Sequence, residues 1–131
     1  MGNNLNFIPG EKLIDTLRNL AATHDLRRRA EEGCRQWLTT WAAEEGGLDG
    51  LSIDEIEVHF EKCYLAFEHG VLSYPFIETR FGLFVRDSRQ IYFRDLRPVG
   101  HYRFITLLDG TVSDDYFVID TETPHRDSFE R

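Results

Sequence analysis

The chain has 131 residues with 15 basic and 23 acidic side chains, so its formal net charge is −8 at pH 7. This length is typical of one compact domain, and no stretch approaches the roughly 20 apolar residues of a membrane span. The negative charge opposes non-specific attraction to polyanions, so we expect neither a membrane nor non-specific nucleic acid as a partner.

The order of the sequence patterns predicts an α+β fold, with three N-terminal helices packed on one face of a four-stranded antiparallel meander. Apolar residues recur at helical spacing before about residue 72 and alternate after it. Residues 1–119 are expected to form this single domain, and residues 120–131 a flexible C-terminal tail. Cys34 and Cys63 fall in helical patterns and are interpreted as free, buried thiols. With no signal peptide pattern at the start of the chain, we expect a cytoplasmic protein.

The first two helices are predicted from amphipathic spacing. The first begins near Pro9, a residue suited to the first helical position, and Thr23 caps the second. The expected inward face of the first helix consists of Leu13, Ile14, Leu17, Leu20 and Ala21. That of the second consists of Leu26, Ala30, Cys34, Trp37, Leu38 and Trp41.

A third helix is predicted over residues 52–70. Ser52 and Glu55 have the spacing of a capping box, and Leu51 and Ile56 that of a hydrophobic staple. Gly70 is suited to the left-handed position that follows a helix end. The expected buried stripe consists of Ile53, Ile56, Phe60, Cys63, Tyr64 and Phe67.

The remainder predicts four strands, at about 75–86, 90–97, 100–108 and 111–119. Asp109-Gly110 is typical of a type I′ hairpin turn, in which both central residues take positive φ. This turn sets a register. The register pairs Leu107 with Val112, Ile105 with Asp114, Arg103 with Tyr116, and His101 with Val118.

Two further turns complete the expected meander. A Pro98-Val99 turn would place Arg94 opposite Arg103 and Phe93 opposite Phe104, and a loop at 87–89 would close the first hairpin. The face toward the helices then consists of Phe81, Leu83, Val85, Ile91, Phe93, Tyr102, Phe104, Phe117 and Ile119. The opposite face consists of Arg80, Phe84, Arg86, Tyr92, Arg94, His101, Arg103, Asp114 and Tyr116.

This opposite face supplies the candidate binding site. Six arginines and two acids lie between Arg80 and Arg103, a local balance of +4 in a chain of −8. Arginine grips carboxylate or phosphate bidentately and stacks on aromatic rings. A solvated polar face with cross-strand pairs is the alternative interpretation. The candidate binding residues are Arg80, Arg86, Tyr92, Arg94, His101, Arg103 and Tyr116.

Candidates for acid–base chemistry, if the chain is an enzyme, are His101, Asp114 and Asp115. Asp114 is expected to pair with Arg103 across the hairpin. Asp115 falls on the apolar face opposite Phe104, so the two aspartates cannot form a dyad. No nucleotide-binding, hydrolase or zinc-protease motif is present, and no cofactor is expected.

A metal site is considered on the predicted third helix. Glu55, His59 and Cys63 recur at intervals of four residues, which would place them on one side of a helix. One helix supplies at most two or three ligands, and no second motif completes a tetrahedral site. We therefore expect no metal.

These observations favour a small acidic binding or regulatory protein, of the inhibitor or adaptor type, over an enzyme. Its arginine and tyrosine face would recognise a protein partner or an anionic ligand. A homodimer through the same face, which also exposes Phe84, is an open alternative. In a further alternative, the acidic helical half would bind a basic nucleic-acid-binding protein.

The order of helices and a curved meander resembles the NTF2-like cone folds. That resemblance implies a small-molecule-binding protein or enzyme with a pocket between helices and sheet. The pocket would lie near Tyr64, Phe67, Tyr102 and Asp115.

Overall fold

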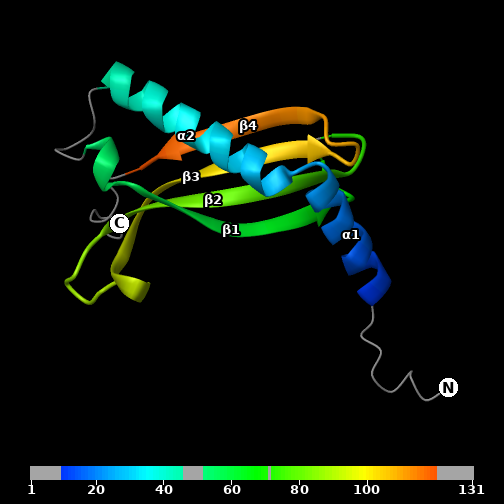
Figure 1. The fold of residues 1–131 in the computed structure, drawn as a ribbon, viewed down its shortest axis with the longest axis horizontal. Coiled ribbons are helices and arrows are strands. Elements are labelled where there is room, and N and C mark those ends of the chain that lie inside the picture. The colour runs from blue at the N-terminus through cyan, green and yellow to red at the C-terminus, as the bar shows by residue number, and fades with distance from the viewer. Residues whose placement is uncertain (1–9, 46–51, 71, 121–131) are drawn as a thin grey trace, which may run out of the picture.

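The computed structural model describes residues 10–45, 52–70 and 72–120, which form one helical layer and one sheet (Figure 1). The helices in this part of the chain are α1 (Glu11–Thr23) and α2 (Leu26–Glu45), followed by two short 3₁₀ turns, η2 (Ile53–Glu55) and η3 (Phe93–Asp95). The strands are β1 (Glu57–Ala66), β2 (Phe76–Arg86), β3 (Leu96–Leu107) and β4 (Val112–Ile119). They form an antiparallel sheet in the order β1-β2-β3-β4. The α+β fold and the four-stranded antiparallel sheet are therefore confirmed.

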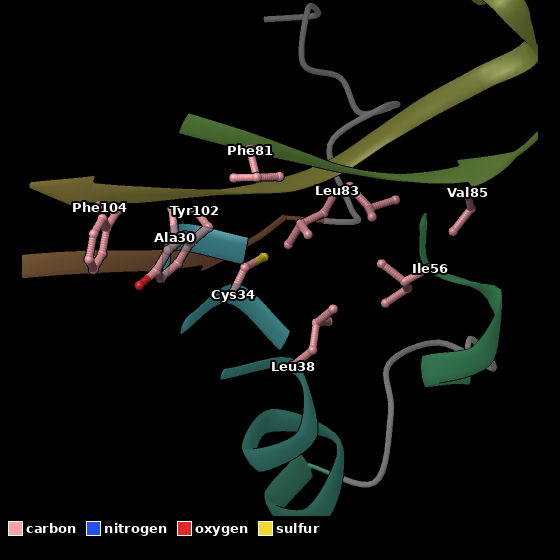
Figure 2. Close-up of a cluster of buried hydrophobic side chains, with 10 residues drawn as sticks. Ala30, Cys34, Leu38, Ile56, Phe81, Leu83, Val85, Tyr102 and Phe104 are labelled. Carbon is pink, nitrogen blue, oxygen red and sulfur yellow. The ribbon is translucent and has the colours of Figure 1, made fainter. Parts of the chain in front are cut away.

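The core lies between helix α2 and one face of the sheet (Figure 2). Leu26, Ala30, Cys34 and Leu38 recur every four residues along the helix, so they lie on one side, and all four are buried. The helix lies across one face of the sheet (Figure 1), and at its centre it packs on a fully buried Tyr102. The expected helix-facing residues of the sheet that join this core are Phe81, Leu83, Val85, Tyr102, Phe104, Phe117 and Ile119.

Helix α1 projects beyond the sheet (Figure 1), and it buries none of its residues. It begins at Glu11 after Gly10, whereas Pro9 lies outside the described residues. The expected inward face of this helix forms only in part, because Leu13 is 56% exposed and Ile14 is also exposed, whereas Leu17, Leu20 and Ala21 are half-buried. The part of the helix that projects beyond the sheet has no sheet against which to bury its apolar residues.

The predicted third helix was wrong: residues 57–66 form β1. The capping box of Ser52 and Glu55 does form, with the Glu55 carboxylate accepting the Ser52 amide N–H at 3.0 Å, but it caps only η2. The alternating residues Ile56, Val58 and Phe60 then pack on the core side of the sheet. The segment therefore follows its alternating pattern and forms an edge strand, although the same residues also fit a helical spacing.

Two other predictions for this segment are also wrong, and a third is untested. Cys63 is exposed rather than buried. Gly70 does not adopt a positive φ, and Leu51 of the expected staple lies outside the described residues.

The predicted strand at 90–97 was also wrong, because residues 87–95 form the loop between β2 and β3, here called the β2–β3 loop. The expected Pro98-Val99 turn is absent, since Pro98 lies inside β3 beside a register shift that tolerates its missing N–H. Arg103 therefore pairs with Arg80, and Phe104 with Thr79, instead of with Arg94 and Phe93.

The last hairpin follows the predicted register. Ile105 pairs with Asp114, Arg103 with Tyr116, and His101 with Val118. At the turn itself Val112 pairs with Thr106 rather than Leu107, and only Gly110 takes a positive φ, so the turn is not type I′. The Asp109 carboxylate accepts the Thr111 N–H at 2.9 Å, an Asx turn that stabilises a looser loop.

No helix in the described part of the chain is long and apolar enough to cross a membrane. Of the expected C-terminal tail, only Asp120 lies among the described residues, and its N–H donates to the Val99 carbonyl at 2.7 Å.

Candidate functional site

The sheet face that points away from α2, here called the outer face, gathers most of the candidate residues. Strand alternation and the pairing of neighbours define it as four cross-strand rows. The rows are Glu57, Phe84 and Pro98; His59, Gly82, His101 and Val118; Lys62, Arg80, Arg103 and Tyr116; and Tyr64, Glu78, Ile105 and Asp114. Arg86, two residues after Phe84 on β2, lies on the same face. In the described part of the chain, α2 packs on the opposite face and α1 projects beyond the sheet (Figure 1).

The arginines of this face are paired with glutamates. Arg80 contacts Glu61 at 3.2 Å, with Glu61 standing at the register shift of β1. Arg86 bonds Glu57 through Nε at 2.7 Å and Nη2 at 3.1 Å. This pairing corrects the expected local excess of positive charge, because β1 brings carboxylates that the sequence prediction had placed on a helix.

In the third pair the glutamate is buried and the arginine is partly exposed. Glu78 is 1% exposed and accepts a hydrogen bond from Arg103 Nη2 at 3.1 Å. That contact raises the pKa of Arg103, whose guanidinium also stacks on Tyr116 at 4.9 Å. The expected Arg103–Asp114 ion pair was wrong, since the Asp114 carboxylate instead accepts the Asp115 N–H at 2.8 Å.

A cleft of about 410 Å³ opens on the outer face beside Gly82. A Cβ at Gly82 would lie 2.3 Å from the Glu61 carboxylate and 2.6 Å from the Phe84 ring, so glycine leaves the space those side chains occupy. His101 lines the cleft, and burial followed by the charges of Arg80 and Arg103 lowers its pKa. A neutral imidazole is thus favoured in this position.

A second cleft, of about 460 Å³, adjoins the first and shares Glu61, Phe84, Tyr92 and Pro98 with it. Its walls are mostly aromatic and aliphatic, and the β2–β3 loop contributes Phe93 and Arg94 to its rim. The two clefts are therefore neighbours, and both are lined by aromatic and charged side chains.

The β2–β3 loop is held in a strained conformation. Gln90, Arg94 and Asp95 all have positive φ, at 66°, 56° and 58°. Such conformations cost about 1–3 kcal/mol for residues other than glycine and persist only where surrounding contacts enforce them. The Asp87 N–H donates to the Asp95 carbonyl at 2.9 Å, and Arg86 Nη1 donates to the Arg94 carbonyl at 3.4 Å.

Most predicted binding residues therefore come together. Arg80, Arg86, His101, Arg103 and Tyr116 share the outer face, and Tyr92 lines both clefts. Arg94 lies apart in the loop, at the rim of the second cleft. The residues that the sequence prediction missed are Glu57, His59, Glu61, Gly82 and Phe93. Had 56–60 been interpreted as alternating, Glu57, His59 and Glu61 would have been found.

The candidates for acid–base chemistry lie on the two faces that strand alternation predicts for them. His101 and Asp114 lie on the outer face, whereas Asp115 lies on the helix side and accepts hydrogen bonds from Tyr102 Oη at 2.7 Å and Trp37 Nε1 at 3.0 Å. Asp115 thus connects α2 to the sheet on the helix side, away from the outer face. It does pair with Phe104, as expected.

The pocket implied by the cone-fold resemblance does not form from its four expected residues. Tyr64 lies on the outer face and Phe67 is exposed, whereas Tyr102 is buried on the helix side with Asp115. No cluster of three or more potential metal ligands occurs among the described residues. His59 and Cys63 of the spacing considered above lie on opposite faces of β1.

Comparison of the chain with protein-family models, with curated proteins and with solved structures finds no match.

Proposed function

We propose that this chain is a small binding protein, of the inhibitor or adaptor type, that recognises a protein partner through the outer face of its sheet. One observation carries the proposal: the described helices leave this face uncovered, and two adjoining clefts there are lined by aromatic side chains and bordered by ion pairs. Aromatic residues and arginine are enriched where proteins bind each other.

The pairing of the charges favours a protein over a free anion as the ligand. An anion entering the first cleft would compete with Glu61 for Arg80, and Asp120 lines the same cleft. A protein surface can instead match alternating positive and negative groups without displacing either. Such matching contributes to specificity and to the rate of encounter more than to affinity.

A charge-swap variant tests this proposal. Glu61→Arg with Arg80→Glu keeps the ion pair and the net charge, but it reverses the pattern that a partner meets. The matched control is the swap Glu31→Arg with Arg35→Glu, which reverses a solvent-exposed pair at 2.9 Å on α2. Circular dichroism and thermal melting establish that both variants fold.

The readout is affinity capture from a lysate of the source cells, quantified by mass spectrometry. We expect the wild-type chain and the α2 swap to capture the same proteins, and the Glu61/Arg80 swap to lose them. Equal capture by both swaps would overturn the proposal. A wild-type chain that elutes as a dimer, and becomes monomeric with the Glu61/Arg80 swap, would show a homodimer interface instead.

A further inference from the structure

The β2–β3 loop presents large apolar side chains to solvent. Phe93 is 82% exposed and Ile91 is 65% exposed, two residues apart on the same loop. Single exposed apolar residues are ordinary on protein surfaces, but Phe93 also lines the second cleft, whose walls are mostly apolar. Apolar side chains exposed beside an apolar cleft are typical of interaction sites.

The loop is pre-organised and does not depend on a partner for its shape. The Asp87 carboxylate is 10% exposed, accepts hydrogen bonds from Arg89 at 2.6 and 2.8 Å, and has Arg97 Nε at 3.5 Å. At the other end of the loop, Arg86 links the Arg94 carbonyl to Glu57 of β1. A loop already fixed in its bound shape loses little entropy when it binds.

The charge beside Phe93 indicates what it would contact. The Arg94 guanidinium lies 5.1 Å from the Phe93 ring centroid and forms no ion pair with any described residue. Arg80, Arg86, Arg89, Arg97 and Arg103 all have carboxylate partners. Arg94 is therefore the arginine of this region whose charge is available to another molecule.

We infer that the β2–β3 loop is the anchor of the interface, with Phe93 inserted into an apolar pocket of the partner protein and Arg94 paired with a carboxylate at the edge of that pocket. The inference rests on the proposed function and specifies the partner's surface: a concave apolar site with an acidic edge. Aromatic side chains and arginine are both enriched at protein interfaces and among the residues that contribute most to binding.

Site-specific photo-crosslinking tests the inference on the intact protein. Phe93 is replaced by the photoreactive analogue p-benzoylphenylalanine, and the chain is irradiated in the lysate used for capture. The matched control carries the same analogue at Phe67, which is 71% exposed in the connection between β1 and β2. We expect position 93, and not position 67, to crosslink a protein that the Glu61/Arg80 swap fails to capture.

Quantitative capture of that protein then measures the contribution of Phe93 and of Arg94 separately. Phe93→Ala and Arg94→Glu should each weaken capture by roughly tenfold or more, as hot-spot residues do. Phe67→Ala and Arg18→Glu, on exposed side chains elsewhere, should not. Reversing the carboxylate nearest the crosslink in the partner should restore capture by Arg94→Glu.

The outcomes distinguish the inference from the proposed function. If the Glu61/Arg80 swap loses the partner but Phe93→Ala and Arg94→Glu retain it, the loop is not the anchor, although the outer face still binds. A crosslink from position 93 to a second copy of the chain, to lipid, or to nothing specific would overturn the inference.

Discussion

At the scale of single residues, the contact between Gly33 of α2 and Tyr102 of β3 fixes how closely helix and sheet approach. A Cβ at Gly33 would lie 2.3 Å from the Tyr102 hydroxyl and 3.1 Å from the ring carbon that carries it. The hydroxyl cannot swing away freely, because it donates to Asp115 at 2.7 Å and the ring is fully buried. Burial and the Asp115 hydrogen bond also raise the pKa of Tyr102, so the group remains a donor.

Gly33→Ala is therefore expected to destabilise the protein, although alanine favours a helix over glycine by about 1 kcal/mol. Overpacking of this kind costs about 1–3 kcal/mol, which should exceed the gain. Urea unfolding measures the difference. The control is Gly70→Ala, where a Cβ would meet no atom within 4 Å and φ is not positive. A Gly33→Ala variant as stable as Gly70→Ala would contradict this account.

Single residues also show which features of the structure could be predicted from the sequence and which could not. The register of the last hairpin placed Asp115 opposite Phe104 on the apolar side, as the structure has it. Its partners Trp37 and Tyr102 could not be assigned, because Trp37 lies 78 positions away along the chain. Alternation within a strand is local information, whereas a hydrogen bond between helix and sheet depends on how the two layers dock.

At the scale of elements, the segment from Ile56 to Ala66 shows why a well-marked helix start is insufficient. The capping box at Ser52 is a local signal and forms as expected. The capping box does not indicate how many helical turns follow it, because helix length depends on packing and not on the cap. The free edge of β2 instead takes β1 as a partner, and hydrogen bonds along that edge outweigh the helical pattern.

The prediction of the candidate site also depended on whether residues 57–66 form a helix or a strand. The arginines of β2 and β3 were placed on one face because their strands alternate regularly. Their carboxylate partners Glu57 and Glu61 were missed because a helix would have carried them away from the sheet. The shared face was thus predictable from the sequence, and its charge balance was not.

The β2–β3 loop gives a pH-dependent prediction. Hydrogen bonds from Arg89 are the main cause that lowers the pKa of Asp87 from 3.8 to about 2. Because the folded-state pKa lies below the ordinary value, Asp87 stabilises the fold above about pH 4, and this contribution is lost as the pH falls toward 2. Asp87→Asn should therefore lower the free energy of unfolding at neutral pH, with the difference from wild type shrinking between pH 4 and 2.

Arg89→Ala provides the companion measurement, since it removes the main cause of the shift. Denaturant titrations at several pH values should show a smaller effect of Asp87→Asn in the Arg89→Ala background than in the wild type. An Asp87→Asn effect that is constant with pH, or additive with Arg89→Ala, would show that the carboxylate does not hold the loop through this contact.

At the scale of the whole molecule, positive and negative side chains are balanced on the proposed interface, whereas the whole chain has a net negative charge. The chain carries −8, yet the arginines of the outer face are matched by glutamates from β1 and β2. The excess negative charge therefore lies elsewhere on the molecule. It favours solubility without setting a strong single-sign field across the clefts.

The two cysteines report separately on the state of the whole fold. Cys34 lies in the middle of the core cluster (Figure 2), where burial raises the pKa of its thiol to about 12. Cys63 is exposed at the edge strand β1. Because the thiolate is the form that reacts, alkylation of Cys34 requires opening of the interface between α2 and the sheet, whereas Cys63 reacts in the folded protein.

We therefore expect iodoacetamide at pH 8 to modify Cys63 in native buffer and Cys34 only as urea unfolds the chain. The extent of Cys34 labelling, measured by mass spectrometry after short pulses, should follow the loss of sheet signal in circular dichroism with the same midpoint. A Cys63→Ser variant isolates the Cys34 signal. Labelling of Cys34 in native buffer at the rate of Cys63 would mean that α2 separates from the sheet without unfolding it. The helix and sheet would then be two units and not one cooperative core.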